Sequence, residues 1–186
     1  MIIVGIGANL AHPEYGLPRR TCGAALAMID DMGIPVIRRS RWYESAPVVR
    51  DGGAGPADQP WYVNGAIETR GSRGAEELLA VLLRVEDAFG RQRSVPDAPR
   101  TLDLDILVFD QEIIRSAALT VPHPRLHQRA FALLPIADLA PQWRHPETGE
   151  TVAELIEVLG NDQGIQVQAD AAGYMGTEWM LPSASE

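Results

Sequence analysis

Two aspartates spaced two residues apart carry the strongest chemical signal in this sequence. Asp103 and Asp105 stand in the run Leu102-Asp103-Leu104-Asp105-Ile106, whose other residues are apolar. Because side chains alternate between the two faces of an extended strand, we expect both carboxylates on one face. Neighbouring carboxylates repel each other, and oxygen ligands without a local His or Cys favour a hard cation such as Mg²⁺. The alternative is a strand whose charged face is simply solvated.

Arginines around this strand favour the cation site over a solvated face. The flanking segments carry Arg84, Arg91, Arg93, Arg100, Arg115, Arg125 and Arg129. Guanidinium groups form forked contacts with phosphate oxygens. Acids on one strand with arginines on both sides of it therefore predict a site for a metal-bound polyphosphate. Arg115 and Arg125 also fit ordinary surface charge.

The basic residues exclude several classes of protein. All 16 are Arg, which rules out a Walker A loop and a Schiff-base lysine. The excess of Arg could also reflect the coding preference of the source, so the absence of Lys excludes these functions without assigning another. The net charge is −9, and residues 147–186 hold eight acids and no Arg. An acidic chain without Lys is a poor general binder of nucleic acid, so we expect no nucleic-acid partner.

Length and cysteine content indicate one domain in a reducing compartment. A chain of 186 residues can bury a core without disulfides, and Cys22 is its only cysteine. Cys22 begins an apolar helical run, which favours packing over a nucleophilic role. A strand starts at once after Met1, and no apolar run approaches the length of a membrane span. We expect a cytoplasmic protein without a membrane partner.

Periodicity and turn residues predict alternating strands and helices. Strands are expected over residues 2–7, 35–43, 61–69 and 102–109, and helices over 17–32, 74–89, 130–139 and 151–159. The order β-α-β-β-α-β is typical of an α+β ferredoxin-like sandwich: an antiparallel sheet with helices on one face and the ligand cleft on the other. The predicted domain spans residues 1–159. Residues 160–186 are expected to form an acidic extension, partly disordered or docked.

A glycine-bearing run near the N-terminus resembles part of a dinucleotide-binding fingerprint. In Gly5-Ile6-Gly7-Ala8-Asn9-Leu10 the third glycine position is occupied by Leu10. The predicted elements also do not form a series of parallel βαβ units. A tight turn from a strand to a helix is the favoured explanation for these glycines.

Longer motifs resemble the 6-hydroxymethyl-7,8-dihydropterin pyrophosphokinase family of the folate pathway. They are Gly90-Arg91-Gln92-Arg93, Pro99-Arg100-Thr101-Leu102-Asp103-Leu104-Asp105-Ile106-Leu107, Val121-Pro122-His123-Pro124-Arg125 and Arg129-Ala130-Phe131. Gly7-Ala8-Asn9-Leu10, Tyr43-Glu44-Ser45-Ala46-Pro47 and Asp58-Gln59-Pro60-Trp61-Tyr62-Val63-Asn64 follow the family's order as well. The resemblance covers residues 1 to about 159 and implies the same ferredoxin-like fold.

The resemblance implies a phosphate-binding half of the site. Asp103 and Asp105 would hold two Mg²⁺ ions that bridge the phosphates of ATP, and with Arg91 and Arg100 they would form the catalytic set. The residues placed with ATP are Glu86, Arg93, Arg100, Ile106, Thr120, His123 and Arg129. Two of them have plainer alternatives: His123 could cap a turn, and Glu86 could be a solvated helix residue.

The resemblance also implies a pterin pocket and a reaction. Tyr62 and Phe131 would stack on the flat ring, Asn64 would contact its hydrogen-bonding edge, and Ser45 and Val48 would line the pocket. Without the resemblance the two aromatic residues could equally be core. The implied activity is transfer of pyrophosphate from ATP to the hydroxymethyl group of the pterin, with release of AMP, and functional neighbours are expected among the other folate enzymes. The alternative is a catalytically weakened relative that binds nucleotide or pterin as a sensor.

Overall fold

The central strand of the fold is β1, Ile2–Ala8, the apolar run at the start of the sequence. The structure is a computed structural model that describes residues 1–47, 59–71, 74–91, 99–160 and 163–168. In it, β1 pairs antiparallel with β4, Tyr62–Thr69, on one side and with β5, Asp103–Phe109, on the other. A strand with a neighbour on each edge satisfies its backbone hydrogen bonds, so this apolar segment can be buried.

Three shorter strands extend the sheet beyond β4. Both β2, Val36–Arg39, and β3, Tyr43–Ser45, pair antiparallel with β4, and β8, Ile165–Val167, pairs antiparallel with β3. The strand order is β5-β1-β4-β3-β8, with β2 also beside β4. The single strand predicted over residues 35–43 is therefore two strands. The Ser40 hydroxyl accepts a hydrogen bond from the β4 backbone between them, which replaces the regular ladder at that point.

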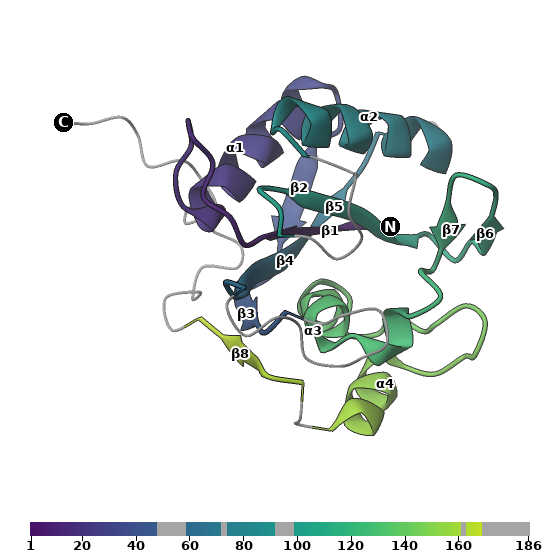
Figure 1. The fold of residues 1–186 in the computed structure, drawn as a ribbon. Helices are drawn as coiled ribbons and strands as arrows, with labels where there is room; N and C mark the ends of the chain where they lie inside the picture. The colour runs from purple at the N-terminus through teal and green to yellow at the C-terminus, as the bar shows by residue number, and fades with distance from the viewer. Residues whose placement is uncertain (48–58, 72–73, 92–98, 161–162, 169–186) are drawn as a thin grey trace.

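Two helices cross over the sheet and confirm the predicted topology. The first, α1, Pro18–Asp31, connects β1 to β2, and α2, Ala75–Ala88, connects β4 to β5. Each connection passes over one intervening strand, which is the β-α-β-β-α-β arrangement of the ferredoxin-like sandwich. Both helices lie on the same side of the sheet (Figure 1). Gly90 follows α2 with a φ of +71°, as expected for a glycine that ends a helix.

Apolar side chains of alternate strand residues form the core beneath these helices. Val4 and Ile6 of β1, Leu104 and Ile106 of β5 and Leu82 of α2 belong to one buried cluster. This period of two is the one predicted for residues 102–106, and it turns the intervening residues of β5 to the opposite face of the sheet. The helix layer therefore fixes which face receives the two aspartates.

A β-bulge in β5 ends this alternation. Val4 is opposite Ile106 and Ile3 is opposite Val108, so Leu107 is an extra residue between the two pairs. As a result Leu107 and Val108 both join the cluster on the second face of the sheet. Strict alternation would have sent one of them into the α1–α2 layer.

The second face of the sheet is partly covered by later elements of the chain. The short β-hairpin of β6, Ile114–Arg115, and β7, Thr120–Val121, leads to a 3-10 turn, η1, Leu126–Gln128. Helices α3, Ala130–Leu139, and α4, Val152–Leu159, follow and pack on the side opposite α1 and α2 (Figure 1). The helices predicted to lie together on one face of the sheet therefore correspond to α1 and α2. The other face holds α3 and α4 with a cleft beside them.

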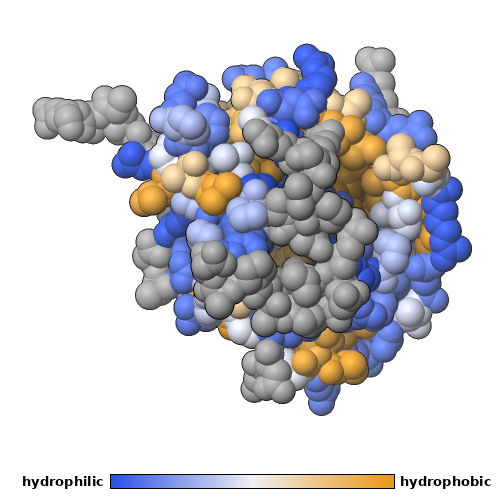
Figure 2. Space-filling view, in the orientation of Figure 1, coloured by the Kyte–Doolittle hydropathy of each residue, from blue (hydrophilic) through white to orange (hydrophobic). Residues whose placement is uncertain are grey.

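Hydrophobic and hydrophilic residues are interspersed on the coloured part of the visible face (Figure 2). In the orientation of Figure 1, hydrophobic residues form separate patches among hydrophilic ones (Figure 2). Among the described residues, no helix has the length and apolar character that crossing a membrane requires.

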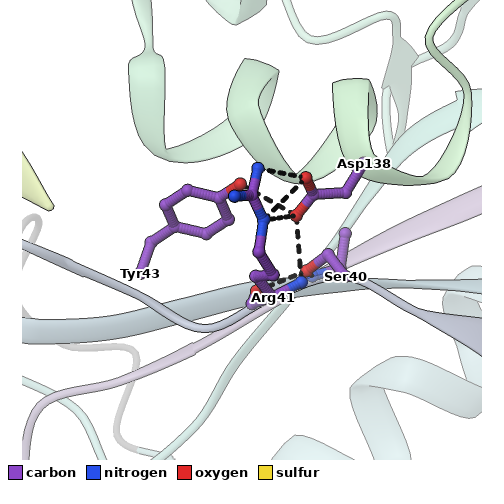
Figure 3. Close-up of polar contacts among 5 residues, drawn as sticks. Ser40, Arg41, Tyr43 and Asp138 are labelled. Atoms are coloured by element: carbon purple, nitrogen blue, oxygen red, sulfur yellow. Dashed lines mark hydrogen bonds and ion pairs between the residues drawn. The ribbon is translucent and has the colours of Figure 1, made fainter. Parts of the chain in front are cut away.

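One ion-pair cluster ties α3 to the sheet. The Asp138 carboxylate of α3 accepts a 2.6 Å bond from Nη2 of Arg41 and a 2.8 Å bond from the Tyr43 hydroxyl (Figure 3). Burial, together with the neighbouring Asp138 charge, raises the pKa of Tyr43, so the phenol keeps its proton and donates. Because Tyr43 is fully buried, water cannot replace the Asp138 carboxylate as the acceptor of its hydroxyl hydrogen bond.

We expect Asp138→Ala to lower the free energy of unfolding by about 2–3 kcal/mol. The substitution leaves the buried Tyr43 hydroxyl without its acceptor and removes the charge-assisted contact with Arg41. Chemical denaturation followed by circular dichroism measures this. Asp31→Ala, at an exposed position of α1, is the matched control and should change stability by less than about 0.5 kcal/mol. Equal effects of the two substitutions would show that the cluster does not anchor α3.

Candidate active site

A cleft opens on the sheet face opposite α1 and α2, between the central strands and the η1–α3 segment. Nine predicted site residues line it: Ser45, Tyr62, Asn64, Arg100, Asp103, Asp105, His123, Arg129 and Phe131. They come from β3, β4, β5 and the residues just before β5, from the segment between β7 and α3, and from α3 itself, so the fold gathers residues that are up to 86 positions apart in the sequence. Of these residues, only Asp103 and Asp105 could be predicted from their spacing in the sequence to lie side by side.

Glycines form the floor of the cleft beside the two aspartates. Gly5 of β1 is opposite Asp105, and Gly7 is opposite Asp103. A Cβ atom at Gly7 would lie 2.9 Å from the side-chain oxygen of Asn64, and one at Gly5 would lie 3.1 Å from the side chain of Leu107. The turn expected at these glycines is therefore wrong. They lie within a strand, where the absence of a side chain leaves room above the sheet.

Asp103 is balanced by two guanidinium groups. Its Oδ1 lies 2.6 Å from Nη1 of Arg91 and 3.1 Å from Nη1 of Arg100. Burial by itself would raise the pKa of Asp103, but the charges of Arg100 and Arg91 outweigh burial and lower it. Asp103 is therefore held as a carboxylate by cations that approach from two different segments.

Asp105 is in a different electrostatic position on the same strand face. Burial first, and then the nearby charge of Asp103, raise the pKa of Asp105 to about 6. Arg129 and Arg91 oppose this rise without cancelling it. Two carboxylates whose pKa values are driven apart mark a site at which an added cation would favour the ionised form of both.

Glu86, on α2, contacts both Arg91 and the backbone of β5. Its carboxylate, in the last part of α2, forms an ion pair with Arg91 and accepts a 2.7 Å hydrogen bond from the Leu104 backbone N–H. Glu86 is only 1% exposed, which removes the alternative of a solvated helix residue. The same guanidinium that contacts Asp103 is thus held by a buried carboxylate fixed to β5.

His123 and Arg129 contribute to the side of the cleft formed by the chain around η1. Burial, followed by the charges of Arg129 and Arg125, lowers the pKa of His123 to about 4. The ring is therefore neutral at pH 7, and its Nδ1 accepts a 3.0 Å bond from the Arg125 backbone N–H. A neutral imidazole with Nδ1 as acceptor carries its proton on Nε2, which leaves one donor for an anionic oxygen.

Four of the predicted pterin residues, Ser45, Tyr62, Asn64 and Phe131, line the cleft but differ in character. The Asn64 side-chain amide donates a 2.9 Å bond to the Ser45 hydroxyl, and both residues are buried. Tyr62 is partly buried, and its hydroxyl accepts a 3.2 Å bond from Gln59. Phe131 is also partly buried and has the Arg129 guanidinium 5.5 Å from its ring centre. These two aromatic residues face a cavity rather than filling the core.

Several predicted residues lie apart from the cleft lining. The Ile106 side chain is 1% exposed and packs in the α1–α2 layer, so only its backbone could meet a nucleotide. Thr120 lies in β7, paired with Arg115, and does not line the cleft. Arg93 and Val48 lie outside the described residues, and their predicted roles stay predictions.

Asn9 is a site residue that sequence reasoning missed. Its side chain accepts a 2.8 Å bond from the Arg100 backbone N–H and donates a 3.0 Å bond to the Pro60 carbonyl. Its own backbone N–H donates to the Arg100 carbonyl at 3.0 Å. Asn9 is 3% exposed and so fixes the segment that carries Arg100 from within. The available signals were a polar residue directly after a buried strand and its place in Gly7-Ala8-Asn9-Leu10, a run that follows the order of the family, although no role was predicted for Asn9 itself.

The donor set fits a hard cation that completes its coordination with ligand oxygens. The described residues contain no group of three or more His, Cys, Asp or Glu side chains that could hold an ion by themselves. Asp103 and Asp105 supply carboxylate oxygens alone, the ligand type that Mg²⁺ prefers, and Mg²⁺ commonly uses one or two carboxylates plus substrate phosphates. The two residues could therefore hold Mg²⁺ together with a phosphate-bearing ligand.

Fold and cleft together define an α+β sandwich whose site suits a cation-bound, phosphate-bearing ligand. Residues 3–141 match the family model described as 7,8-dihydro-6-hydroxymethylpterin-pyrophosphokinase (HPPK). The chain belongs to this family, which confirms the resemblance seen in its motifs. The match ends before α4 and β8.

Individual relatives agree with the family assignment. The 2-amino-4-hydroxy-6-hydroxymethyldihydropteridine pyrophosphokinase of Synechocystis is 39% identical over 155 residues, which cover 83% of this chain and 74% of the relative. The protein of the same name from Bacillus subtilis is 34% identical, covering 87% and 92%. The wild-type HPPK-DHPS crystal structure from Plasmodium falciparum has a TM-score of 0.62 at 13% identity over 84% of this chain, which shows the shared fold. This chain spans only 40% of that longer protein.

Removing the Asn9 amide should destabilise the protein. Asn9→Ala leaves the Arg100 N–H and the Pro60 carbonyl without their side-chain partner, so we expect a loss of about 1–3 kcal/mol in the free energy of unfolding. Denaturant titration measures it. Glu14→Ala, at an exposed position of the same loop, is the control and should stay within about 0.5 kcal/mol of the parent. A stability unchanged by Asn9→Ala would contradict the anchoring role.

The raised pKa of Asp105 predicts a pH-dependent stability in the ligand-free protein. The folded state keeps the Asp105 proton up to about pH 6, above the range where the unfolded chain releases it, so this contribution is present at low pH and lost as pH rises through 6. Asp105→Asn should therefore be more stable than the parent at pH 8, by about 1–3 kcal/mol, and nearly equal at pH 4.

Asp103→Asn is the matched control for this measurement. Because Arg100 and Arg91 lower the pKa of Asp103, its loss should reduce stability at pH 8, opposite in sign to Asp105→Asn. Thermal unfolding of the three proteins at pH 4 and pH 8 gives the comparison. The same sign for both substitutions at pH 8 would contradict the electrostatic description of the pair.

Proposed function

We propose that this protein transfers the pyrophosphoryl group of ATP to the hydroxymethyl group of 6-hydroxymethyl-7,8-dihydropterin, with release of AMP, in folate biosynthesis. The observation that carries the proposal is the family match together with a cleft that combines paired carboxylates, arginines and aromatic side chains. The activity named for the relatives is a pyrophosphokinase of the same pterin, and they align over most of this chain.

Asp103 and Asp105 are the residues that would hold the Mg²⁺ ions, two of which are expected. Bound Mg²⁺ neutralises phosphate charge and orients the phosphate oxygens for displacement. Arg91 and Arg100 contact the Asp103 carboxylate in the structure. When cation and ATP bind, these guanidinium groups become available to the triphosphate, and the cleft keeps its charge balance in both states.

The cationic side chains would position the triphosphate and stabilise charge that develops during transfer. Arg91 and Arg100 both contact Asp103 at the cleft, and Arg129 and the neutral His123 line the cleft on the η1 side. Arg93 is proposed to take part with them. Fixed donors of this kind lower the barrier because they need no reorganisation when the charge moves.

The pterin would occupy the part of the cleft lined by aromatic and amide side chains. Tyr62 and Phe131 offer flat surfaces for stacking, and the buried Asn64 amide, oriented by Ser45, is placed to read the hydrogen-bonding edge of the ring. Val48 is proposed to complete the pocket. A small number of fixed polar groups in a largely apolar pocket gives specificity for one ring orientation.

In the proposed reaction the hydroxymethyl oxygen forms a bond to the β-phosphorus of ATP. The bond between that phosphorus and the oxygen bridging to the α-phosphorus breaks, AMP leaves with this oxygen, and the hydroxyl proton is released. No covalent enzyme intermediate is needed, because the residues act by placing the two substrates and neutralising charge.

The proposed setting is the cytoplasm, with small-molecule substrates and no nucleic-acid partner. Cys22 is a buried free thiol whose pKa is raised by burial, which suits a reducing compartment. Folate enzymes are proposed as functional neighbours, since the folate synthesis bifunctional protein of Pisum sativum contains a region 34% identical to 74% of this chain.

AMP should form only when ATP, Mg²⁺ and the pterin alcohol are all present, and chromatographic detection of AMP tests this. Asp103→Asn combined with Asp105→Asn should lower the rate by about 100-fold or more, because the cation loses its protein ligands. Asp31→Asn, remote from the cleft, should leave the rate unchanged. Normal AMP formation by the double variant would refute the metal role. Binding of ATP or pterin without any turnover by the parent protein would indicate the sensor function instead.

A further inference from the structure

The segment after α4 contacts two walls of the cleft. Building on the proposed function, we infer that Gln163 is a positioning residue that holds Arg129 in place for the triphosphate. The inference rests on the hydrogen bonds of Gln163, on the pairing of the residues that follow it, and on the position of Arg129 between two short helical elements.

Gln163 binds the backbone on both sides of Arg129. Its side-chain oxygen accepts a 2.9 Å bond from the Ala130 N–H, and its side-chain nitrogen donates a 2.9 Å bond to the Gln128 carbonyl. Ala130 is the first residue of α3, and its N–H has no partner within the helix. Arg129, the preceding residue, makes no side-chain cap, so an amide from a distant segment takes the place of a helix cap.

The two hydrogen bonds of the Gln163 side chain hold the backbone at a point where it changes direction. Arg129 ends η1 and precedes α3 with extended dihedral angles, φ −128° and ψ 100°. A single extended residue between two helical turns projects its side chain according to how the turns are held relative to each other. The guanidinium of Arg129 lines the cleft and lies 5.5 Å from the centre of the Phe131 ring, so a shift of this backbone moves a cation and an aromatic surface together.

The residues after Gln163 fix its position against the opposite wall. Gly164 accepts a 3.1 Å bond from the Ala46 backbone N–H, and Ile165 of β8 is paired with Ser45 of β3. Ser45 and Ala46 line the cleft. One short segment therefore connects the β3 wall to the α3 wall, and Gln163 transmits this connection to Arg129. We propose accordingly that the domain includes residues 163–168 and so extends beyond the boundary predicted at residue 159.

A double-mutant cycle separates positioning from a merely structural effect. Steady-state AMP formation is measured for the parent, Gln163→Ala, Arg129→Ala and the double variant, with KM determined for ATP and for the pterin. If Gln163 acts through Arg129, Gln163→Ala should raise the KM for ATP by about fivefold in the parent and should have almost no effect when Arg129 is already Ala. Additive effects, or an unchanged KM for ATP, would overturn the inference.

Gln166→Ala is the matched control on the same segment. Gln166 is exposed in β8 and its side chain contacts Glu44 at 3.4 Å, away from Arg129, so both KM values should stay at the parent values. A rise in KM for ATP with Gln166→Ala equal to that with Gln163→Ala would assign the effect to β8 as a whole and reject the specific role. Thermal unfolding of each variant establishes that it is folded.

Gln163→Glu provides a second test if Gln163→Ala does not fold. It keeps the acceptor for the Ala130 N–H and loses the donor to the Gln128 carbonyl, so its KM for ATP should also rise in the parent and not in Arg129→Ala. An unchanged KM would again reject the inference. Failure of the proposed function is recognised separately, because the parent protein would then form no AMP under any condition.

Discussion

The repulsion between two carboxylates on one face of a single strand governs the arrangement of the cleft. The strand pleat fixes the spacing of Asp103 and Asp105, so their backbone positions cannot move apart to relieve the repulsion. The protein balances Asp103 with Arg91 and Arg100, whereas burial and the Asp103 charge leave Asp105 with a raised pKa. Asp105 is therefore the less compensated of the two carboxylates, and an added cation would favour its ionised form.

Buried polar groups hold the two arginines that contact Asp103. Glu86 fixes the Arg91 guanidinium and the backbone of β5 together, and Asn9 fixes the backbone of Arg100. Both anchors are almost fully buried, where a hydrogen bond is expensive to leave unmade. Glycines at positions 5 and 7 keep the floor free of side chains. A site held in this way loses little conformational freedom when ligands bind, which favours affinity and charge stabilisation alike.

The order of the elements was predictable from the sequence because its signals are local. Residues 130–139 form a helix with the expected limits, and Gly90 ends α2 as expected. Predictions failed where a distant partner intervenes. The Ser40 hydroxyl bonds to β4 and divides the strand expected over residues 35–43, and the bulge at Leu107 breaks the alternation of β5. Neither event leaves a mark on the periodicity of the segment itself.

The sequence by itself determined the chemical types of the site: paired acids at a strand spacing, arginines on the flanking segments, and motifs specific enough to identify the family. Only the tertiary structure decided which groups meet. It brought Arg91 and Arg100 to the same carboxylate, buried Glu86, and bound the Gln163 side chain to the backbone of Gln128 and Ala130. The physical reason is that side-chain alternation is a property of neighbouring residues, whereas burial, pKa shifts and contacts between separate segments depend on how the whole chain packs.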